Sequence, residues 1–219
     1  MAVLIIVEGS QDAHAIEKLL NDRLPEPDRV CGWYREIDNQ VKPFTARAAG
    51  GYGTLLKEMP SILAAHEGSI AFVVDADSDV DRRWTSLTDR ISSLEDIERI
   101  PQAPDANGTV LEPVNPRRIG VWIWPNNRDI GDLETFAATM VPPADELWRH
   151  ASSTVDALGE RKRFIETHEN KAKLYTWLAW QNPPGQQIGA AIRGHALNSD
   201  SPLAQSLKAW LHQLKDLDT

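Results

Sequence analysis

Two short apolar runs that each end in acidic residues constrain the fold of this chain most strongly. The first run, Ala2 to Val7, is followed by Glu8-Gly9, and the second, Ile70 to Val74, is followed by Asp75-Ala76-Asp77-Ser78-Asp79. Uninterrupted apolar, β-branched runs of this length are typical of parallel strands that helices cover on both faces. Ligands of open α/β sheets bind beyond the carboxyl ends of the strands. We therefore expect Glu8 and Asp75 to lie at one sheet edge.

The rest of the chain alternates between strand and helix patterns, which predicts an α/β fold with a mostly parallel, Rossmann-like sheet flanked by helices. Further strands are predicted at 30–37, 44–48 and 119–124, and helices at 11–24, 50–66, 81–94 and from 133 onward. Pro101 to Pro116 reads as a long irregular connection or a small hairpin. From about Pro142 the pattern is helical, at 146–158, 161–167, 171–181 and 202–217. We predict an α/β core at 1–141 and a helical C-terminal extension at 142–219 that packs on it.

Length and composition limit the class of protein. A chain of 219 residues with 42% hydrophobic residues can bury one sizeable core. Its lone Cys31 excludes an intrachain disulfide and a cysteine cluster for zinc. No leader pattern and no bilayer-length apolar stretch is present, so we expect a soluble, cytoplasmic protein without a membrane partner. The tryptophans Trp177, Trp180 and Trp210 lie at helical spacing, which favours core packing over base stacking.

The formal net charge of −9 argues against binding nucleic acid through a broad basic surface. It does not exclude a nuclease, because cations bound at an acidic site would offset part of this charge locally. Basic residues for phosphate contacts are Arg117-Arg118, Arg128, and the set Arg161, Lys162, Arg163, Lys171 and Lys173. The alternative for that set is an ordinary charged helix face, since glutamates at 160, 166 and 169 are interleaved with it.

The acidic residues at the strand ends suit a divalent metal. Carboxylates that converge from separate parts of the chain are the oxygen ligands that Mg²⁺ or Mn²⁺ requires, and such sites serve phosphoryl transfer. The expected metal ligands are Glu8, Asp75 and Asp77, with Asp79 and Glu134 as additional ligands. Each acid also has a structural alternative: Glu8 and Glu134 as first-turn helix carboxylates, and Asp77 or Asp79 as the cap of the helix that begins near Val80.

Glu8-Gly9 followed by Asp75, Asp77 and Asp79 resembles the Toprim domain, the metal-binding fold of topoisomerases, bacterial primases and OLD-family nucleases. Several later segments resemble a small stand-alone Toprim-like family of prokaryotic proteins without settled function, and this second resemblance covers nearly the whole chain. The segments are Arg118 to Trp124 with Pro125-Asn126-Asn127, Gly131-Asp132-Leu133-Glu134, Lys171-Ala172-Lys173, and Tyr175 to Gln181.

The resemblance implies a Mg²⁺- or Mn²⁺-dependent nuclease that acts on DNA or RNA, with one or two ions. In OLD-family nucleases a lysine accompanies two metals, so Lys171 and Lys173 are the catalytic lysines to consider beside Glu8. Lys171 is preferred, because His168-Glu169-Asn170-Lys171 lies at a predicted helix entry. By the same analogy the protein is the nuclease half of a phage-defence system with a separate ATPase chain, since this chain has no Walker motif.

Other functions of this fold lack support in the sequence. Tyr34, Tyr52 and Tyr175 have no topoisomerase-like context, and the modules that accompany primases are missing. A catalytically silent scaffold that binds a partner protein or nucleic acid is the main alternative, and a small-molecule phosphohydrolase is a third. The sequence leaves homo-oligomerisation open.

Overall fold

A five-stranded sheet with the order β2-β1-β3-β5-β4 forms the centre of the protein. The computed structural model describes residues 3–20, 44–114 and 117–215 of the chain. Within these, β1 (Val3–Val7), β2 (Phe44–Ala48), β3 (Ile70–Asp75) and β5 (Ile119–Trp124) are parallel, and the edge strand β4 (Thr109–Leu111) pairs antiparallel to β5. All four parallel strands therefore end at the same edge of the sheet.

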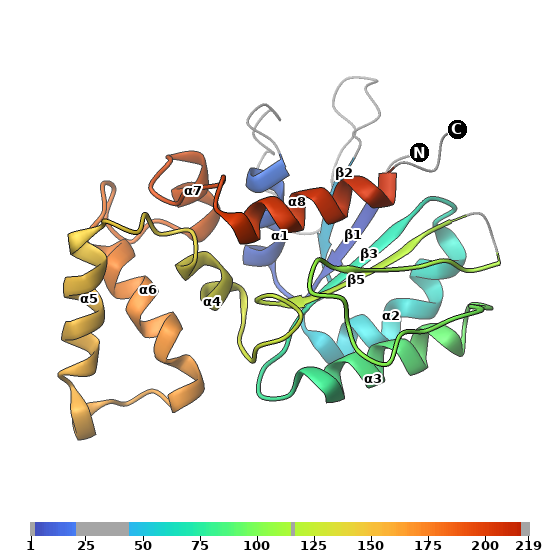
Figure 1. Ribbon diagram of the computed structural model, residues 1–219, viewed down its shortest axis with the longest axis horizontal. Coiled ribbons are helices and arrows are strands. Elements are labelled where there is room, and N and C mark those ends of the chain that lie inside the picture. The colour runs from blue at the N-terminus through green and yellow to red at the C-terminus, as the bar shows by residue number, and fades with distance from the viewer. Residues whose placement is uncertain (1–2, 21–43, 115–116, 216–219) are drawn as a thin grey trace.

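Helices cover both faces of this sheet, as the fully apolar strands require. Figure 1 shows α2 (Tyr52–Ala65) and α3 (Val80–Ser92) on one face, and α1 (Ser10–Leu20) and α8 (Pro202–Lys215) on the other. Alternate residues of each strand join one of two buried clusters: Phe72 packs with α2 and α3, whereas Val73 packs with α1 and α8. The chain is an α/β protein whose mostly parallel sheet is flanked by helices, with a helical C-terminal part.

Helix α8 approaches the sheet closely because β5 carries a glycine beneath it. A Cβ atom at Gly120 would lie 2.5 Å from Leu214 Cδ1 and 2.7 Å from Trp210 Cζ2. The Trp210 indole is fully buried, and its Nε1 donates a hydrogen bond of 3.0 Å to the carbonyl oxygen of Thr109 on β4. The last helix is thus fixed to two strands of the sheet.

Replacing Gly120 with alanine is expected to destabilise the protein by about 1–3 kcal/mol, because the added methyl group overpacks the contact with α8. Gly53 is the matched control: it lies inside α2, and a Cβ there would meet no atom within 4 Å. Gly53→Ala should stabilise by about 0.5–1 kcal/mol through helix propensity. Urea unfolding curves of both variants measure these changes, and equal effects of the same sign would contradict the close packing of α8.

The remaining C-terminal helices lie beyond the edge of the sheet at which the parallel strands end. Figure 1 shows α5 (Glu146–Asp156) and α6 (Glu169–Ala179) side by side at the left, with α4 (Leu133–Ala138) between them and the sheet. Trp148 on α5 packs edge-on against Trp177 on α6, with ring centroids 6.3 Å apart. Helix α7 (Ile188–Arg193) packs on α1. The helix pair α5 and α6 is therefore anchored to the core through α4.

Several expectations need correction. The segment 161–167 is not an α-helix, because 3₁₀ turns at Gly159–Arg161 and Glu166–His168 flank a non-helical stretch. The connection before β5 contains β4, which makes it a hairpin, and α7 was not expected. Trp177 and Trp210 are buried as predicted, but Trp180 is 41% exposed. The predicted strand at 30–37 and the predicted helix end at 21–24 lie outside the described residues. No helix in the described part is long and apolar enough to cross a membrane.

Candidate functional site

Glu8 and Asp75 meet at the carboxyl edge of the sheet. Val7 pairs with Val73 across β1 and β3, so the residues that follow each strand are neighbours. The backbone N–H of Asp75 donates a hydrogen bond of 3.0 Å to Glu8 Oε1. The amides of Gly50 and Gly51 each donate to the carbonyl oxygen of Glu8 at 2.9 Å, which holds the loop before α2 against the same edge. Burial raises the pKa of Glu8, although its hydrogen bond from Asp75 opposes this.

Asp75 lies at the centre of a group of carboxylates. Its Oδ1 is buried and has no hydrogen-bond partner among the described residues. The pKa of Asp75 is raised to about 8, mainly by burial and further by the negative charges of Asp12, Glu8, Asp132 and Asp77. These four side chains and Asp75 are called the acidic cluster below. A buried carboxylate oxygen without a donor, among like charges, is expensive unless a cation or proton compensates it.

Two members of the acidic cluster, Asp12 and Asp132, were not expected as ligands. Asp12 lies in the first turn of α1, where its two oxygens accept from Trp124 Nε1 at 3.0 Å and from the Gly9 amide at 3.1 Å. Burial raises the pKa of Asp12 to about 6. Asp132 is the N-cap of α4, and its Oδ1 accepts from the Thr135 backbone N–H at 2.9 Å. Asp75 is the last residue of β3, whereas Asp132 lies at the end of the loop that follows β5. Its place in the exit of β5 was the signal for it in the sequence.

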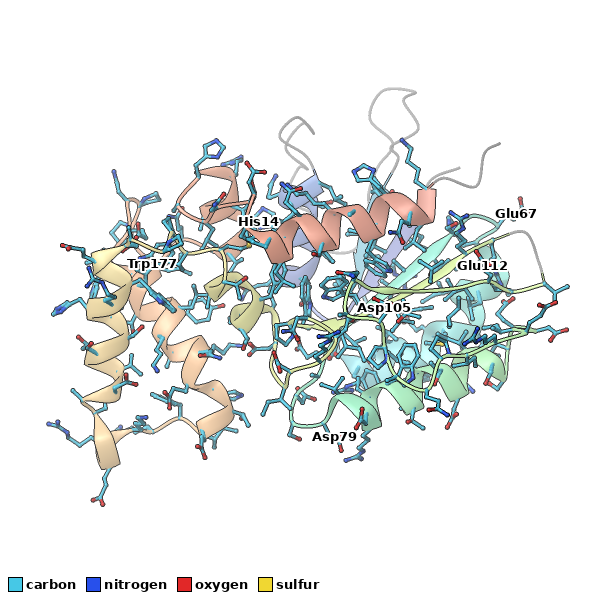
Figure 2. All side chains as sticks on the ribbon, viewed as in Figure 1. His14, Glu67, Asp79, Asp105, Glu112 and Trp177 are labelled. Atoms are coloured by element: carbon cyan, nitrogen blue, oxygen red, sulfur yellow. The ribbon has the colours of Figure 1, made fainter. Side chains whose placement is uncertain are left out.

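Asp77 and Asp79 have different roles. Asp77 adopts a positive φ of 53°, its N–H donates to the carbonyl oxygen of Gly131 at 3.2 Å, and its carboxylate pairs with Arg83 on α3. Asp79 is the N-cap of α3, and its Oδ1 accepts from the Arg82 N–H at 2.9 Å. Figure 2 shows Asp79 in the loop that leads into this helix. The structural alternative, a helix cap, thus holds for Asp79, whereas Asp77 is a member of the acidic cluster.

Glu134 brings Lys171 to the site. It lies in the first turn of α4 and is 5% exposed, with Oε1 at 2.8 Å from Lys171 Nζ and 3.0 Å from the Tyr175 hydroxyl. The Lys171 amine also lies 4.0 Å from Asp132 Oδ2. Burial lowers the pKa of Lys171, but the hydrogen bond to Glu134 and the charges of Glu134 and Asp132 outweigh burial and raise it. Lys171 therefore stays cationic beside the acidic cluster, and Glu134 is already paired with it.

Lys173 does not reach this group, although it lies on the same helix. Its Nζ pairs with Glu169 Oε1 at 2.7 Å and with Asp156 Oδ1 at 2.9 Å, which links α6 to α5. Lys162 pairs with the same Glu169 at 3.1 Å. Two of the basic residues around α6 therefore belong to a local ion-pair network, as the charged-face alternative predicted.

Arg117 and Arg118 lie far from the carboxyl edge of the sheet. They immediately precede β5, so they lie at the opposite end of that parallel strand from its exit toward Asp132. Arg117 forms a nearly buried ion pair with Glu95. Arg83, which the sequence did not single out, is the arginine that reaches the acidic cluster.

The donor set at this edge fits a hard divalent cation, because it consists of carboxylate oxygens and includes the unpaired Asp75 Oδ1. Within the described residues, however, no three acidic, histidine or cysteine side chains are arranged closely enough to hold an ion as they stand. One carboxylate of the acidic cluster, that of Asp77, is paired with Arg83. A metal ion here would therefore require the acidic side chains to rearrange.

Comparison with known proteins gives one positive result. A model of a family described as a protein of unknown function, DUF3226, matches residues 2–216. Comparisons with curated proteins and with solved structures gave no match. Because the match spans nearly the entire sequence, the chain belongs to the DUF3226 family.

Proposed function

We propose that this protein is a Mg²⁺- or Mn²⁺-dependent nuclease of Toprim type, which hydrolyses phosphodiester bonds of DNA or RNA. One observation carries the proposal: Asp75 has a buried, unpaired carboxylate oxygen among acids from the exits of β1, β3 and β5. Without a metal, only protonation of Asp75, whose pKa is raised to about 8, relieves this crowding. A bound divalent cation would compensate the oxygen and the like charges with Asp75 ionised.

Glu8, Asp75 and Asp77 are the residues that would hold the metal. Bound ions in such sites supply a hydroxide-like water and stabilise the charge on the leaving 3′ oxygen. The protein fixes Glu8 and Asp75 relative to each other through the Asp75 N–H donated to Glu8 Oε1. Asp79 is left out of the ligand set because it caps α3.

Lys171 is the proposed cation for charge that develops on the phosphate oxygens. It is already protonated, lies at the rim of the acidic cluster and is 41% exposed, so a substrate can reach it. Glu134 acts as a positioning residue for this amine, and the Tyr175 hydroxyl, 3.0 Å from Glu134 Oε1, helps to orient that carboxylate. We do not assign this role to Lys173, because its amine pairs with Asp156 and Glu169.

The partner of the proposed nuclease follows from the resemblance to OLD-family proteins alone. By that analogy a separate ATPase chain activates cleavage, and the pair serves in phage defence.

The proposal is tested by incubating the protein with plasmid, linear DNA and structured RNA in Mg²⁺ or Mn²⁺, with and without a candidate ATPase. The wild type should cleave at least one substrate. Loss of groups that merely support a metal ligand costs about 10–100-fold, so Glu8→Gln should lower the rate at least about 100-fold. Glu58→Gln is the control, because that glutamate is 38% exposed and pairs with Arg47. Equal rates for wild type and Glu8→Gln would contradict the proposal.

A catalytically silent Toprim-like scaffold is the second candidate. The pair between Asp77 and Arg83 favours it, because an arginine then serves as the permanent counter-ion of the acidic cluster. Absence of cleavage on every substrate, even with the ATPase present, together with no Mn²⁺ binding, would contradict the nuclease and favour this second candidate.

A further inference from the structure

Arg83 is a cation held inside the acidic cluster. Its side chain extends from the first turns of α3, is 11% exposed and pairs with the carboxylate of Asp77. Its positive charge also lowers the pKa of Glu8, whose carboxyl is otherwise governed by burial. Arg83 therefore lies near two of the proposed metal ligands, Asp77 and Glu8.

The position of Arg83 does not depend on Asp77. The guanidinium lies over the ring of Tyr52, with its central carbon 3.6 Å from the ring centroid. Stacking of this kind attracts the guanidinium to the ring face without any contribution from Asp77. The Asp77 side chain, in contrast, is 69% exposed, and an ion pair with so exposed a partner is weak. Asp77 can therefore leave while Arg83 remains at the site.

The site around Tyr52 keeps a further polar group for a ligand. The Tyr52 hydroxyl oxygen is buried and has no hydrogen-bond partner among the described residues. The backbone N–H of Tyr52, the first residue of α2, contributes to lowering the pKa of Glu8. Glu8, Tyr52 and Arg83 are thus assembled from three separate elements at one place. A guanidinium presents its N–H groups in a planar fork that can bind two oxygens of one phosphate. A lysine ammonium acts instead as a point charge.

We infer that Arg83 is a phosphate-binding residue that serves as the counter-ion of Asp77 without metal and turns to a phosphodiester oxygen when Asp77 binds the cation. This inference rests on the proposed function and adds the group that recognises the substrate anion. In the structure the Asp77 carboxylate is paired with Arg83, and no three side chains of the described residues are grouped for an ion. Arg83 on α3 and Lys171 on α6 then both contact the substrate.

The test compares Arg83→Met with Arg82→Met. Arg82 is the neighbouring, exposed arginine of α3, so both variants lose the same charge from the same helix. Binding of a single-stranded 20-mer of the nucleic acid that the wild type cleaves is measured in Ca²⁺ at several salt concentrations. Each phosphate contact contributes about 0.7 to the slope of log K against log salt concentration for single strands. Arg83→Met should lower the slope by about this amount, and Arg82→Met should leave it unchanged.

Manganese affinity gives a second readout that does not involve catalysis. Removing the competing guanidinium should tighten Mn²⁺ binding by up to about fivefold at pH 8.5, because an exposed ion pair is worth at most about 1 kcal/mol. Arg83→Lys, which keeps the charge but not the planar fork, should keep the wild-type Mn²⁺ affinity and weaken substrate binding. Thermal melts of all variants confirm that they fold.

An unchanged salt slope and an unchanged Mn²⁺ affinity in Arg83→Met, with a wild type that binds Mn²⁺ and cleaves, would overturn the role of Arg83 alone. A wild type that neither binds Mn²⁺ nor cleaves would overturn the proposed function and this inference with it. The two failures are therefore distinguishable.

Discussion

Asp75→Asn is expected to remove Mn²⁺ binding and to stabilise the metal-free protein above neutral pH. Both effects come from one carboxyl group, which burial and four neighbouring acids hold at a pKa of about 8. Asparagine has nearly the same shape and no charge, so the variant no longer repels Glu8 and Asp12. The variant also loses a negatively charged oxygen that the proposed cation requires.

The free energy of unfolding of the metal-free protein should fall as the pH rises. Between about pH 4 and 8 the Asp75 carboxyl is protonated in the folded protein but ionised in the unfolded chain. The folded state then binds more protons, so the free energy of unfolding falls as the pH rises through this window. Asp12, with a pKa of about 6, adds to the slope only below that value. From pH 6 to 8 Asp75 dominates, with a loss of up to about 3 kcal/mol.

Thermal melts in EDTA at pH 6 and pH 8 measure this effect. For a domain of this size 1 kcal/mol corresponds to about 2–4 °C, so the wild-type Tm should fall by about 5–10 °C across the window. The Tm of Asp75→Asn should change much less, and saturating Mn²⁺ at pH 8 should restore the wild type alone. Identical pH profiles for the two proteins would mean that Asp75 is a solvated turn residue.

Lys171→Met is expected to lower nucleic-acid cleavage by about 10²–10³-fold while Mn²⁺ affinity changes little. The protonated amine cannot ligate a cation, but it can stabilise the negative charge that develops on the phosphate in the transition state. Loss of one such donor typically lowers the rate by about 10²–10³-fold. Glu134, at 2.8 Å, holds the amine at the rim of the acidic cluster. Single-turnover cleavage and calorimetric Mn²⁺ titration separate the two quantities.

Lys173→Met is the matched control, since it removes the same group two residues further along α6. Its amine pairs with Asp156 and Glu169, so the rate should stay within about twofold of the wild type, as for a surface ion pair. Arg161→Ala, an exposed charge removed from the 3₁₀ turn, should behave likewise. Equal losses in Lys171→Met and Lys173→Met would show that both lysines act only as part of a charged face.

The sequence was sufficient to predict that Glu8 and Asp75 meet at one edge of the sheet, because parallel strands end at the same edge. It did not predict that no three acids of the described residues are grouped closely enough to hold an ion. Asp12 was not predicted as part of the site, because a carboxylate in the first turn of a helix is equally well explained as a cap. Here Asp12 also accepts a hydrogen bond from the Gly9 amide. Arg83 was not predicted as part of the site, because its role depends on the tertiary contact between α3 and Tyr52, which the local sequence does not indicate.

The choice between the two lysines illustrates a further limit of local patterns. Residues two positions apart on an α-helix point about 200° apart, so Lys171 and Lys173 must face different neighbours. Which of them faces the site depends on how α6 packs between α4 and α5, a tertiary contact. The edge strand β4 was similarly ambiguous, because its three residues are flanked by prolines and turn residues.

Calorimetric titration with Mn²⁺ at pH 8.5 shows whether the acidic cluster binds a divalent cation. The informative comparison is Asp77→Asn with Asp79→Asn, which neutralise two acids of the same loop. Asparagine caps helices about as well as aspartate, so Asp79→Asn should keep α3 and bind Mn²⁺ like the wild type. Asp77→Asn should bind at least about tenfold more weakly. Equal affinities in these two variants, or no heat of binding in the wild type, would contradict the account.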